Sequence, residues 1–226
     1  MTTLVLHGFA GSARPLARFF DEPVTPELPG HADAPDAVCW DEALDRIGRL
    51  LDEPAEVFGY SMGARLALAL ALRRPGSVTR LVLESGTAGI ADAGERTHRK
   101  AEDDALADFI ERSGMERFVE RWEQHPTLAS LRPFAAQLRP ERLAHRPSGL
   151  GSALRHLGVG AQPSYWEDLK TLRTPVRLIA GALDEKFSGL ARRMHEALPH
   201  AELTVIPDCG HAPHLERPQA FAEAIQ

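Results

Sequence analysis

The chain has 226 residues, of which 43% are hydrophobic and 26% are charged, and its formal net charge is −6 at pH 7. This length and composition are typical of one soluble globular domain and exclude disordered and fibrous proteins, while the negative charge disfavours a nucleic-acid binder. No apolar run approaches the ~20 residues that cross a bilayer, and two cysteines, Cys39 and Cys209, are too few for a disulfide framework or a zinc quartet.

Short β-rich runs alternate along the chain with segments of helical pattern. The predicted strands are residues 4–6, 23–27, 56–60, 80–84, 176–180 and 202–206. The predicted helices are residues 40–51, 63–74 and 190–197, with a terminal helix from Gln219. This alternation predicts an α/β fold with right-handed crossovers, in which helices cover both faces of a six-stranded, mainly parallel sheet.

The alternation is interrupted once, between about residues 87 and 172, where no strand is predicted. Helical patterns in this block cover residues 98–113, 115–124, 128–138 and 149–157. We expect a helical lid, inserted into a single domain of residues 1–226, that covers the carboxyl ends of the strands.

Gly59-Tyr60-Ser61-Met62-Gly63 has the form G-x-S-x-G and lies between a predicted strand and a predicted helix. A sharp turn at this place strains the serine and projects its hydroxyl above the sheet, and small residues on either side let the strand and the helix approach. An ordinary glycine-rich turn is the alternative. The context favours Ser61 as a nucleophile or a base.

A second glycine turn, His7-Gly8-Phe9, follows the first predicted strand. We expect the backbone N–H groups of Phe9 and Met62 to converge on a developing oxyanion, because an oxyanion hole needs two such donors close to the serine.

An acid and a histidine follow the last two predicted strands, at Asp184 and His211. The order Ser61, Asp184, His211 predicts a catalytic triad in which Asp184 orients His211 and His211 accepts a proton from Ser61. Asp208 is an alternative acid that is close to His211 in sequence, and His214 is a structural or supporting residue. A His211/His214 metal pair has no further ligand to complete it, so no metal is expected.

Together with Leu28-Pro29-Gly30-His31 and Gly210-His211, these motifs resemble the α/β-hydrolase superfamily over nearly the whole chain. A narrower resemblance is to the 2-succinyl-6-hydroxy-2,4-cyclohexadiene-1-carboxylate synthases of menaquinone biosynthesis. It rests on four segments: Gly59 to Arg65, Glu84-Ser85-Gly86-Thr87-Ala88-Gly89, Glu95-Arg96 with Arg99, and Gly181 to Phe187. The chain departs from the pattern in lacking the first two strands, in Ala32 after Pro29-Gly30-His31, and in Glu123 where an aromatic is usual.

The resemblance implies a substrate with three carboxylates, which need fixed cations when they are buried. The residues that it implies for substrate binding are Arg65, Arg99, Arg146, Tyr60, Trp122 and Lys186. Arg96 is an alternative to Arg99, since it lies one helical turn away, and Trp122 is as typical of a helix core as of a ligand wall.

The expected activity is that of a carbon–oxygen lyase, which eliminates pyruvate from an enolpyruvyl ether without a cofactor. A serine carboxylesterase or thioesterase is the first alternative, because the fold and the triad are common to both. A non-catalytic receptor of small ligands is the second. Because the first residues lack a basic start and a small-residue cleavage site, we expect a cytoplasmic protein, a monomer or weak oligomer, that does not insert into membranes.

Overall fold

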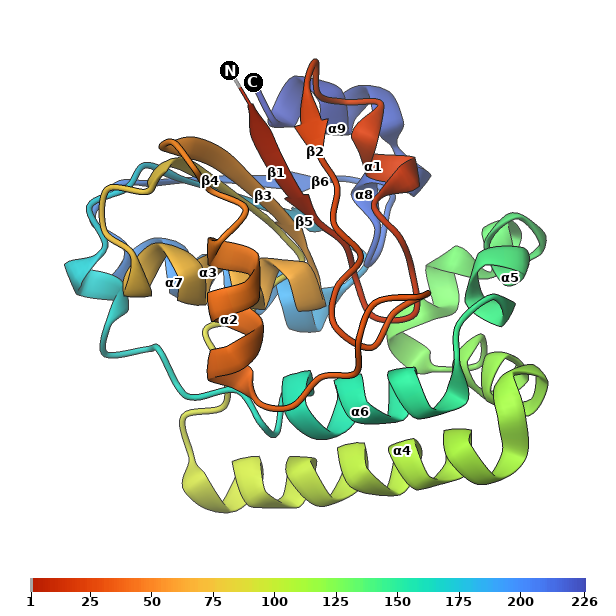
Figure 1. Ribbon diagram of the computed structural model, residues 1–226. Helices are drawn as coiled ribbons and strands as arrows, with labels where there is room; N and C mark the ends of the chain where they lie inside the picture. The colour runs from red at the N-terminus through yellow and green to blue at the C-terminus, as the bar shows by residue number, and fades with distance from the viewer. Residues whose placement is uncertain (1) are drawn as a thin grey trace.

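A sheet of six strands forms the centre of the protein, shown in Figure 1 as a computed structural model that describes residues 2–226. The strand order is β2-β1-β3-β4-β5-β6, and every neighbouring pair is parallel. The strands are β1 (Thr3–Leu6), β2 (Pro23–Val24), β3 (Ala55–Tyr60), β4 (Val78–Glu84), β5 (Val176–Gly181) and β6 (Ala201–Ile206). The predicted six-stranded α/β sheet is confirmed, and in residues 2–226 it is wholly rather than mainly parallel.

Helices cover both faces of the sheet, because successive strand residues are apolar and point to opposite sides. Leu4 and Leu6 pack on one face and Val5 on the other. The first face carries α2 (Trp40–Gly48), α3 (Met62–Arg73) and α7 (Glu185–Ala197), and the second carries α1 (Arg14–Ala17), α8 (Pro213–Glu216) and α9 (Pro218–Ala224) (Figure 1). Residues 62–71 of α3 are all buried, so this helix lies at the centre of the larger core.

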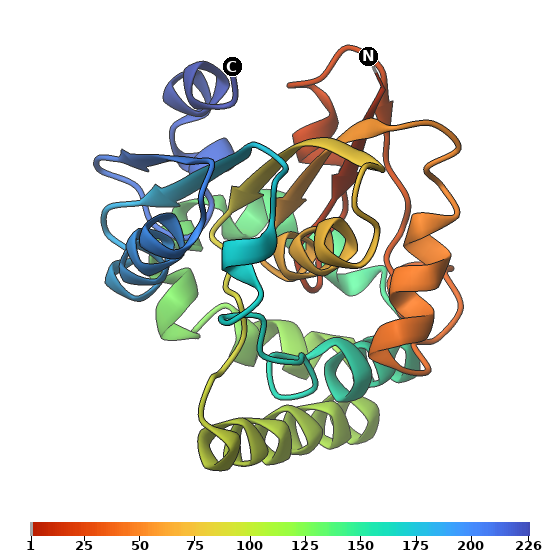
Figure 2. The same cartoon turned by 90° about the vertical axis from the view of Figure 1, so that its left-hand side faces the viewer.

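The segment between β4 and β5 is helical or irregular throughout. It contains α4 (Ala93–Trp122), η1 (Pro126–Phe134), α5 (Ala135–Leu143), α6 (Pro147–Leu157) and η2 (Leu169–Thr171). Figure 2 shows α4 and α6 side by side, below the layer that holds the sheet and its first-face helices. None of the helices in residues 2–226 is long and apolar enough to cross a membrane.

Several predicted boundaries were wrong, each for a local reason. The second strand ends at Val24 rather than at residue 27, since Pro26 has no N–H to donate to a ladder. Helix α4 begins at Ala93 rather than at residue 98, because the Asp92 carboxylate accepts the Glu95 N–H at 2.8 Å and caps it. The predicted break between residues 113 and 115 is confirmed, because Gly114 has non-helical φ 77° and ψ 174° and two helical segments meet there at a kink.

The remaining differences concern short elements. Residues 128–138 were predicted as one helix, but they divide between η1 and α5, since Pro133 cannot donate an α-helical hydrogen bond. Helices α1 and α8 were not predicted, because four residues are too short for a helical period to appear.

Candidate active site

Ser61 occupies the sharp turn between β3 and α3, with φ 51° and ψ −105°. The close approach of strand and helix at this turn requires glycine on both sides. A Cβ on Gly59 would lie 2.4 Å from the Gly63 carbonyl oxygen, and one on Gly63 would lie 2.1 Å from that of Leu6. The Ser61 N–H donates to the Glu84 carbonyl at 2.9 Å, so the strained serine is fixed to the neighbouring strand.

His211 and Asp184 complete a hydrogen-bonded chain with Ser61. The Nε2 atom of His211 lies 3.0 Å from the Ser61 Oγ, and its Nδ1 lies 2.7 Å from the Asp184 Oδ2. Asp184 is held in place because its Oδ1 accepts the Phe187 N–H at 3.2 Å at the start of α7. An Nδ1–H donated to Asp184 leaves Nε2 free to accept the serine proton. Asp208, the alternative acid, is exposed and left-handed at φ 52° in the turn after β6, and it does not hold the ring.

Two backbone N–H groups of residues that line the same cavity as Ser61 have no acceptor in residues 2–226. They belong to Phe9, in the loop after β1, and to Met62, the first residue of α3. The loop is fixed from behind, because the Ala10 N–H donates to the buried His31 Nε2 at 3.2 Å. The arrangement is suited to an oxyanion hole.

A cavity of about 1100 Å³ opens over Ser61 between the sheet and the inserted helices. Of the residues predicted for the site, it is lined by Ser61, His211, Phe9, Met62, Tyr60, Arg65, Arg99, Trp122 and Lys186. Asp184 lies behind His211, and Arg146 does not line the cavity. The structure therefore brings together all but one of the residues predicted to face the substrate.

Arg65 is a cation buried beneath the cavity, with 5% of its surface exposed. Its guanidinium donates to the Gln162 side-chain oxygen at 3.3 Å and lies 5.9 Å from the centre of the Trp40 ring. No carboxylate of residues 2–226 lies within 4.0 Å of it. Burial lowers the pKa of Arg65 to about 10, so the group is still charged at neutral pH.

Arg99 and Arg96 are separated clearly by the structure. Arg99 lines the cavity and donates to the Asp103 carboxylate at 2.8 Å. Arg96 donates to the Ile90 carbonyl and does not line the cavity. The geometry therefore favours Arg99 over its alternative.

The expectation for Arg146 is corrected. Its guanidinium donates to the carbonyl oxygens of Ala32 and Ala34 and to the Asp36 carboxylate, at 3.2, 2.7 and 2.9 Å. These bonds fix the start of α6 to the loop of residues 32–36, outside the cavity. The buried arginine that lines the cavity from this part of the lid is Arg142, which pairs with Glu123 at 3.3 Å.

The other predicted residues form the walls. Trp122 packs edge-to-face against Phe9 at 5.4 Å and stacks on Phe118 at 5.8 Å, so it belongs both to the lid core and to the cavity wall. Lys186 is exposed at the rim beside Phe187. Burial and the nearby Glu84 carboxylate raise the pKa of Tyr60 well above its usual value, which keeps the phenol neutral.

Sequence reasoning missed Gln162 and Arg142. Gln162 is fully buried, and its amide donates to the Thr87 carbonyl at 3.2 Å, which turns its oxygen toward Arg65. No local pattern marks a glutamine in a turn as the partner of a residue 97 positions away. The sequence signal that could have indicated Arg142 is Glu123, which stands where an aromatic is usual. A half-buried carboxylate at that position needs a cation nearby, and Arg142 is that cation.

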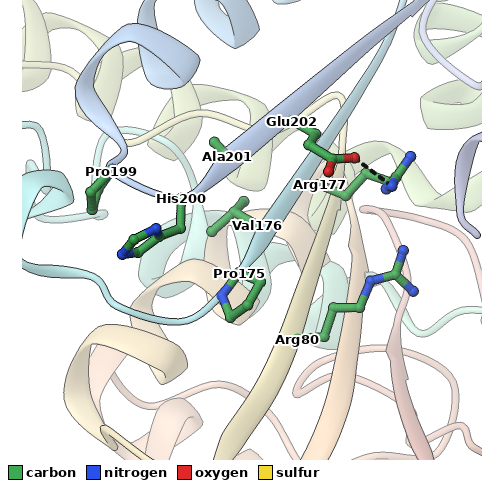
Figure 3. A pocket seen from close by; sticks show the side chains of 8 residues that line it. All are labelled: Arg80, Pro175, Val176, Arg177, Pro199, His200, Ala201 and Glu202. Carbon is green, nitrogen blue, oxygen red and sulfur yellow. Dashed lines mark hydrogen bonds and ion pairs between the residues drawn. The ribbon is translucent and has the colours of Figure 1, made fainter.

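A second depression, of about 330 Å³, lies at the amino ends of β5 and β6 (Figure 3). Its two arginines are already satisfied. Arg177 pairs with Glu202, as drawn, and Arg80 pairs with Glu56 and donates to the Ile225 carbonyl. Because the reactive side chains follow the carboxyl ends of the strands, the candidate active site is the cavity over Ser61.

Comparisons with known proteins agree with this assignment. The sequence profile of the alpha/beta hydrolase family matches residues 3–224. A Serratia proteamaculans (strain 568) protein named 2-succinyl-6-hydroxy-2,4-cyclohexadiene-1-carboxylate synthase is 32% identical, over 88% of this chain and 80% of the relative. A Bacillus subtilis (strain 168) protein to which the same name is provisionally given is 35% identical, over 97% and 87%.

Among solved structures, that of MenH from S. aureus superposes with a TM-score of 0.94 at 31% identity, covering 100% of this chain and 91% of the other. The sequence similarity, the sheet order and the geometry of the turn at Ser61 therefore indicate the same family. The chain belongs to the alpha/beta hydrolase family and, within it, is similar over nearly its whole length to proteins named 2-succinyl-6-hydroxy-2,4-cyclohexadiene-1-carboxylate synthase.

Proposed function

We propose that the protein is a carbon–oxygen lyase of menaquinone biosynthesis, which eliminates pyruvate from 2-succinyl-5-enolpyruvyl-6-hydroxy-3-cyclohexene-1-carboxylate. The names of its relatives support this reaction class, and the site supports it independently. The observation that carries the proposal is Arg65. A buried guanidinium with a neutral partner, one helical turn after Ser61, is suited to a ligand carboxylate and is costly in a site for neutral esters.

The elimination needs a base and a site for negative charge. In the proposed reaction Ser61 removes the ring proton next to the succinyl ketone while His211 accepts the hydroxyl proton. The electrons of the broken C–H bond form an enolate, whose oxygen is held by the N–H groups of Phe9 and Met62. As the enolate collapses, the ring double bond shifts and the ring C–O bond breaks, and the protonated His211 gives its proton to the departing oxygen, so that pyruvate leaves as its enol. The step is balanced without an oxidant, a metal or another cofactor.

Cations around the cavity select and orient the three carboxylates. We assign one carboxylate to the buried Arg65 and the others to Arg99 and Lys186, which line the cavity nearer its rim. Tyr60 and Trp122 form walls for the ring. Arg146 has no direct part in this assignment, since its donors are occupied outside the cavity. The orientation decides which substrate atom meets Ser61 and therefore which reaction follows.

A serine esterase or thioesterase is the second candidate, because Ser61, His211 and Asp184 have the geometry of a nucleophilic triad. A receptor without turnover has no comparable observation in its favour, since an intact triad is not needed for binding.

The test is to measure pyruvate release from the enolpyruvyl substrate and hydrolysis of a short aryl ester with the same enzyme. Pyruvate release that is lost in Ser61→Ala, with ester hydrolysis at least a thousandfold slower in kcat/KM, supports the lyase. Efficient ester hydrolysis with no pyruvate release would assign the protein to the hydrolases, and binding without either reaction would assign it to the receptors.

A further inference from the structure

A second histidine–carboxylate pair lies next to the triad, and the proposed reaction does not use it. Glu84, at the carboxyl end of β4, is fully buried, and His214, in α8, is 3% exposed. The Glu84 Oε1 accepts the His214 backbone N–H at 2.9 Å, and the His214 Nδ1 lies 2.9 Å from both carboxylate oxygens. Glu84 therefore holds both the backbone and the ring of His214.

The same residue is also bonded to the serine turn. The backbone carbonyl of Glu84 accepts the Ser61 N–H at 2.9 Å, and Glu84 is the sheet partner of Tyr60. Glu84 thus contacts Ser61 through its main chain and His214 through its side chain. One residue of β4 links the serine turn to the segment that carries His211.

The segment between His211 and His214 is stiff enough to transmit this anchoring. Glu216 accepts the Gly210 N–H at 2.8 Å and the Ala212 N–H at 3.1 Å, one on each side of His211. The Tyr60 ring fills the space beside both histidines, with its centre 4.7 Å from His214 and 5.6 Å from His211. A displacement of His214 would therefore move His211.

We propose that Glu84 is a positioning residue that, acting through His214, sets the separation of the His211 Nε2 and the Ser61 Oγ. Asp184 fixes the tautomer of His211 through Nδ1. Glu84 fixes the distance between the segment that carries His211 and the strand that leads to Ser61. The inference rests on the triad of the proposed function and not on its substrate, because proton transfer from Ser61 depends steeply on this distance in any reaction.

If Glu84 had a purely structural role, its replacement would lower stability without changing the reactivity of Ser61. A second buried glutamate, Glu56, provides a matched control. Glu56, on β3 at the opposite end of the sheet, is 9% exposed and is bonded to Arg80 at 2.9 Å and to Thr3 at 3.5 Å. Replacing either glutamate by glutamine weakens a buried polar network and lowers the melting temperature. If Glu84 positions the triad, its replacement also lowers the reactivity of Ser61, whereas replacement of Glu56 does not.

The experiment compares Glu84→Gln, His214→Gln and Glu56→Gln with the unaltered chain. Its first readout is the second-order rate at which a fluorophosphonate labels Ser61, which needs an activated serine but no natural substrate. Its second is the kcat and KM of pyruvate release. We expect Glu84→Gln to slow labelling about tenfold and to lower kcat by a similar factor, with KM within about twofold, because binding groups are untouched.

His214→Gln keeps its backbone bond to Glu84, so we expect a smaller effect in the same direction. The double variant should be no slower than the slower single variant, since the two residues act as one unit. Glu56→Gln should label at the original rate even if it melts at a lower temperature.

Unchanged labelling and kcat in folded Glu84→Gln would overturn the inference, and so would equal slowing in Glu56→Gln. If Glu84→Gln does not fold, His214→Gln decides on the same criteria. Failure of the unaltered chain to label at all would overturn the triad itself, and the inference with it. Labelling without pyruvate release would contradict the proposed substrate and leave the test of Glu84 intact.

Discussion

The guanidinium of Arg65 is hydrogen-bonded to the neutral side chain of Gln162, across 97 residues of sequence and beneath the candidate active site. Both residues are buried, and no carboxylate of residues 2–226 lies within 4.0 Å of the arginine, although the more distant Asp103 acts on its charge. A buried charge of this kind is costly unless a ligand pairs with it. The relationship between these two residues supports the view that the cavity binds an anion.

We therefore expect Arg65→Ala to lower kcat/KM for the enolpyruvyl substrate by an amount equivalent to roughly 2–5 kcal/mol, because the substrate carboxylate loses its charged partner. Arg65→Lys should recover part of this loss, since lysine carries the charge without the planar fork of donors. Arg73→Ala is the control, because Arg73 lies on the same helix but is partly exposed and pairs with Asp41. An Arg65→Ala enzyme with unchanged kcat/KM would contradict the assignment.

Arg99 and Arg146 should differ in substrate selectivity. Arg99→Ala should reduce use of the charged substrate and leave hydrolysis of a neutral aryl ester nearly unchanged, because Arg99 lines the cavity. Arg146→Ala should reduce both activities by similar factors and lower the melting temperature, since it releases the loop of residues 32–36 from α6. A selective loss of activity on the charged substrate in Arg146→Ala would restore the direct binding role that the family resemblance implied.

The contrast between these arginines shows what the sequence could and could not determine. The strand–helix order and the turns at Gly59, Ser61 and Gly63 are local patterns, so the fold and the place of the serine were predictable. An arginine in the lid has no such pattern. Arg142 lies in α5 and Arg146 is the extended residue before α6, and packing of the inserted helices against residues 32–36 decides which of them meets the cavity.

Longer-range polar pairs could not be predicted for the same reason. Glu84 and His214 are 130 residues apart, and each reads locally as an ordinary residue at the end of a strand or in a turn. The sheet order brings them together in the buried interior, and no sequence motif marks their pairing. Element boundaries set by a single residue, such as the cap Asp92 or Pro26, are less predictable than the serine turn and more predictable than the long-range pairs. Their signal is local, but it consists of one residue.

Three buried histidines lie in contact behind the loop after β1, and two of them, His31 and His145, should make stability depend on pH. The rings of His7, His31 and His145 meet edge-to-face at 4.8 and 5.4 Å. His31 and His145 accept the backbone N–H groups of Ala10 and Ala32, so these two rings are required in their neutral form. Burial lowers the pKa of His31 well below 6.5 and also lowers that of His145.

The unfolded chain therefore binds more protons than the folded one below about pH 6.5, and stability should fall as the pH falls through this value. The stabilisation from the two neutral rings should be fully present above about pH 6.5, and His31 and His145 each contribute a slope of at most about 1.4 kcal/mol per pH unit. Urea unfolding between pH 5 and 8 measures this slope. His145→Asn, in which an amide oxygen replaces Nδ1 as acceptor, should reduce it, and an unchanged slope in that variant would show that His145 does not titrate with unfolding.

The triad residues should behave as one unit. Ser61→Ala, Asp184→Asn and His211→Ala should each lower kcat by roughly a thousandfold or more in folded protein, and the double variants should be little worse than the worst single variant. Steady-state rates with melting curves provide the test. Near-normal turnover in Asp184→Asn would mean that another carboxylate orients His211, and additive losses would mean that the three residues act separately.

The lyase and the hydrolase differ most directly in what happens to Ser61 during turnover. In the elimination the serine carries only a proton, whereas in ester hydrolysis it forms an acyl-enzyme. Intact-mass measurement of the enzyme, quenched while it turns over the enolpyruvyl substrate and with released pyruvate measured in parallel, distinguishes the two. We predict steady pyruvate release without a burst and an enzyme mass that stays unmodified at every time point. An acyl adduct on Ser61 that forms and decays at the rate of turnover would contradict the proposed elimination.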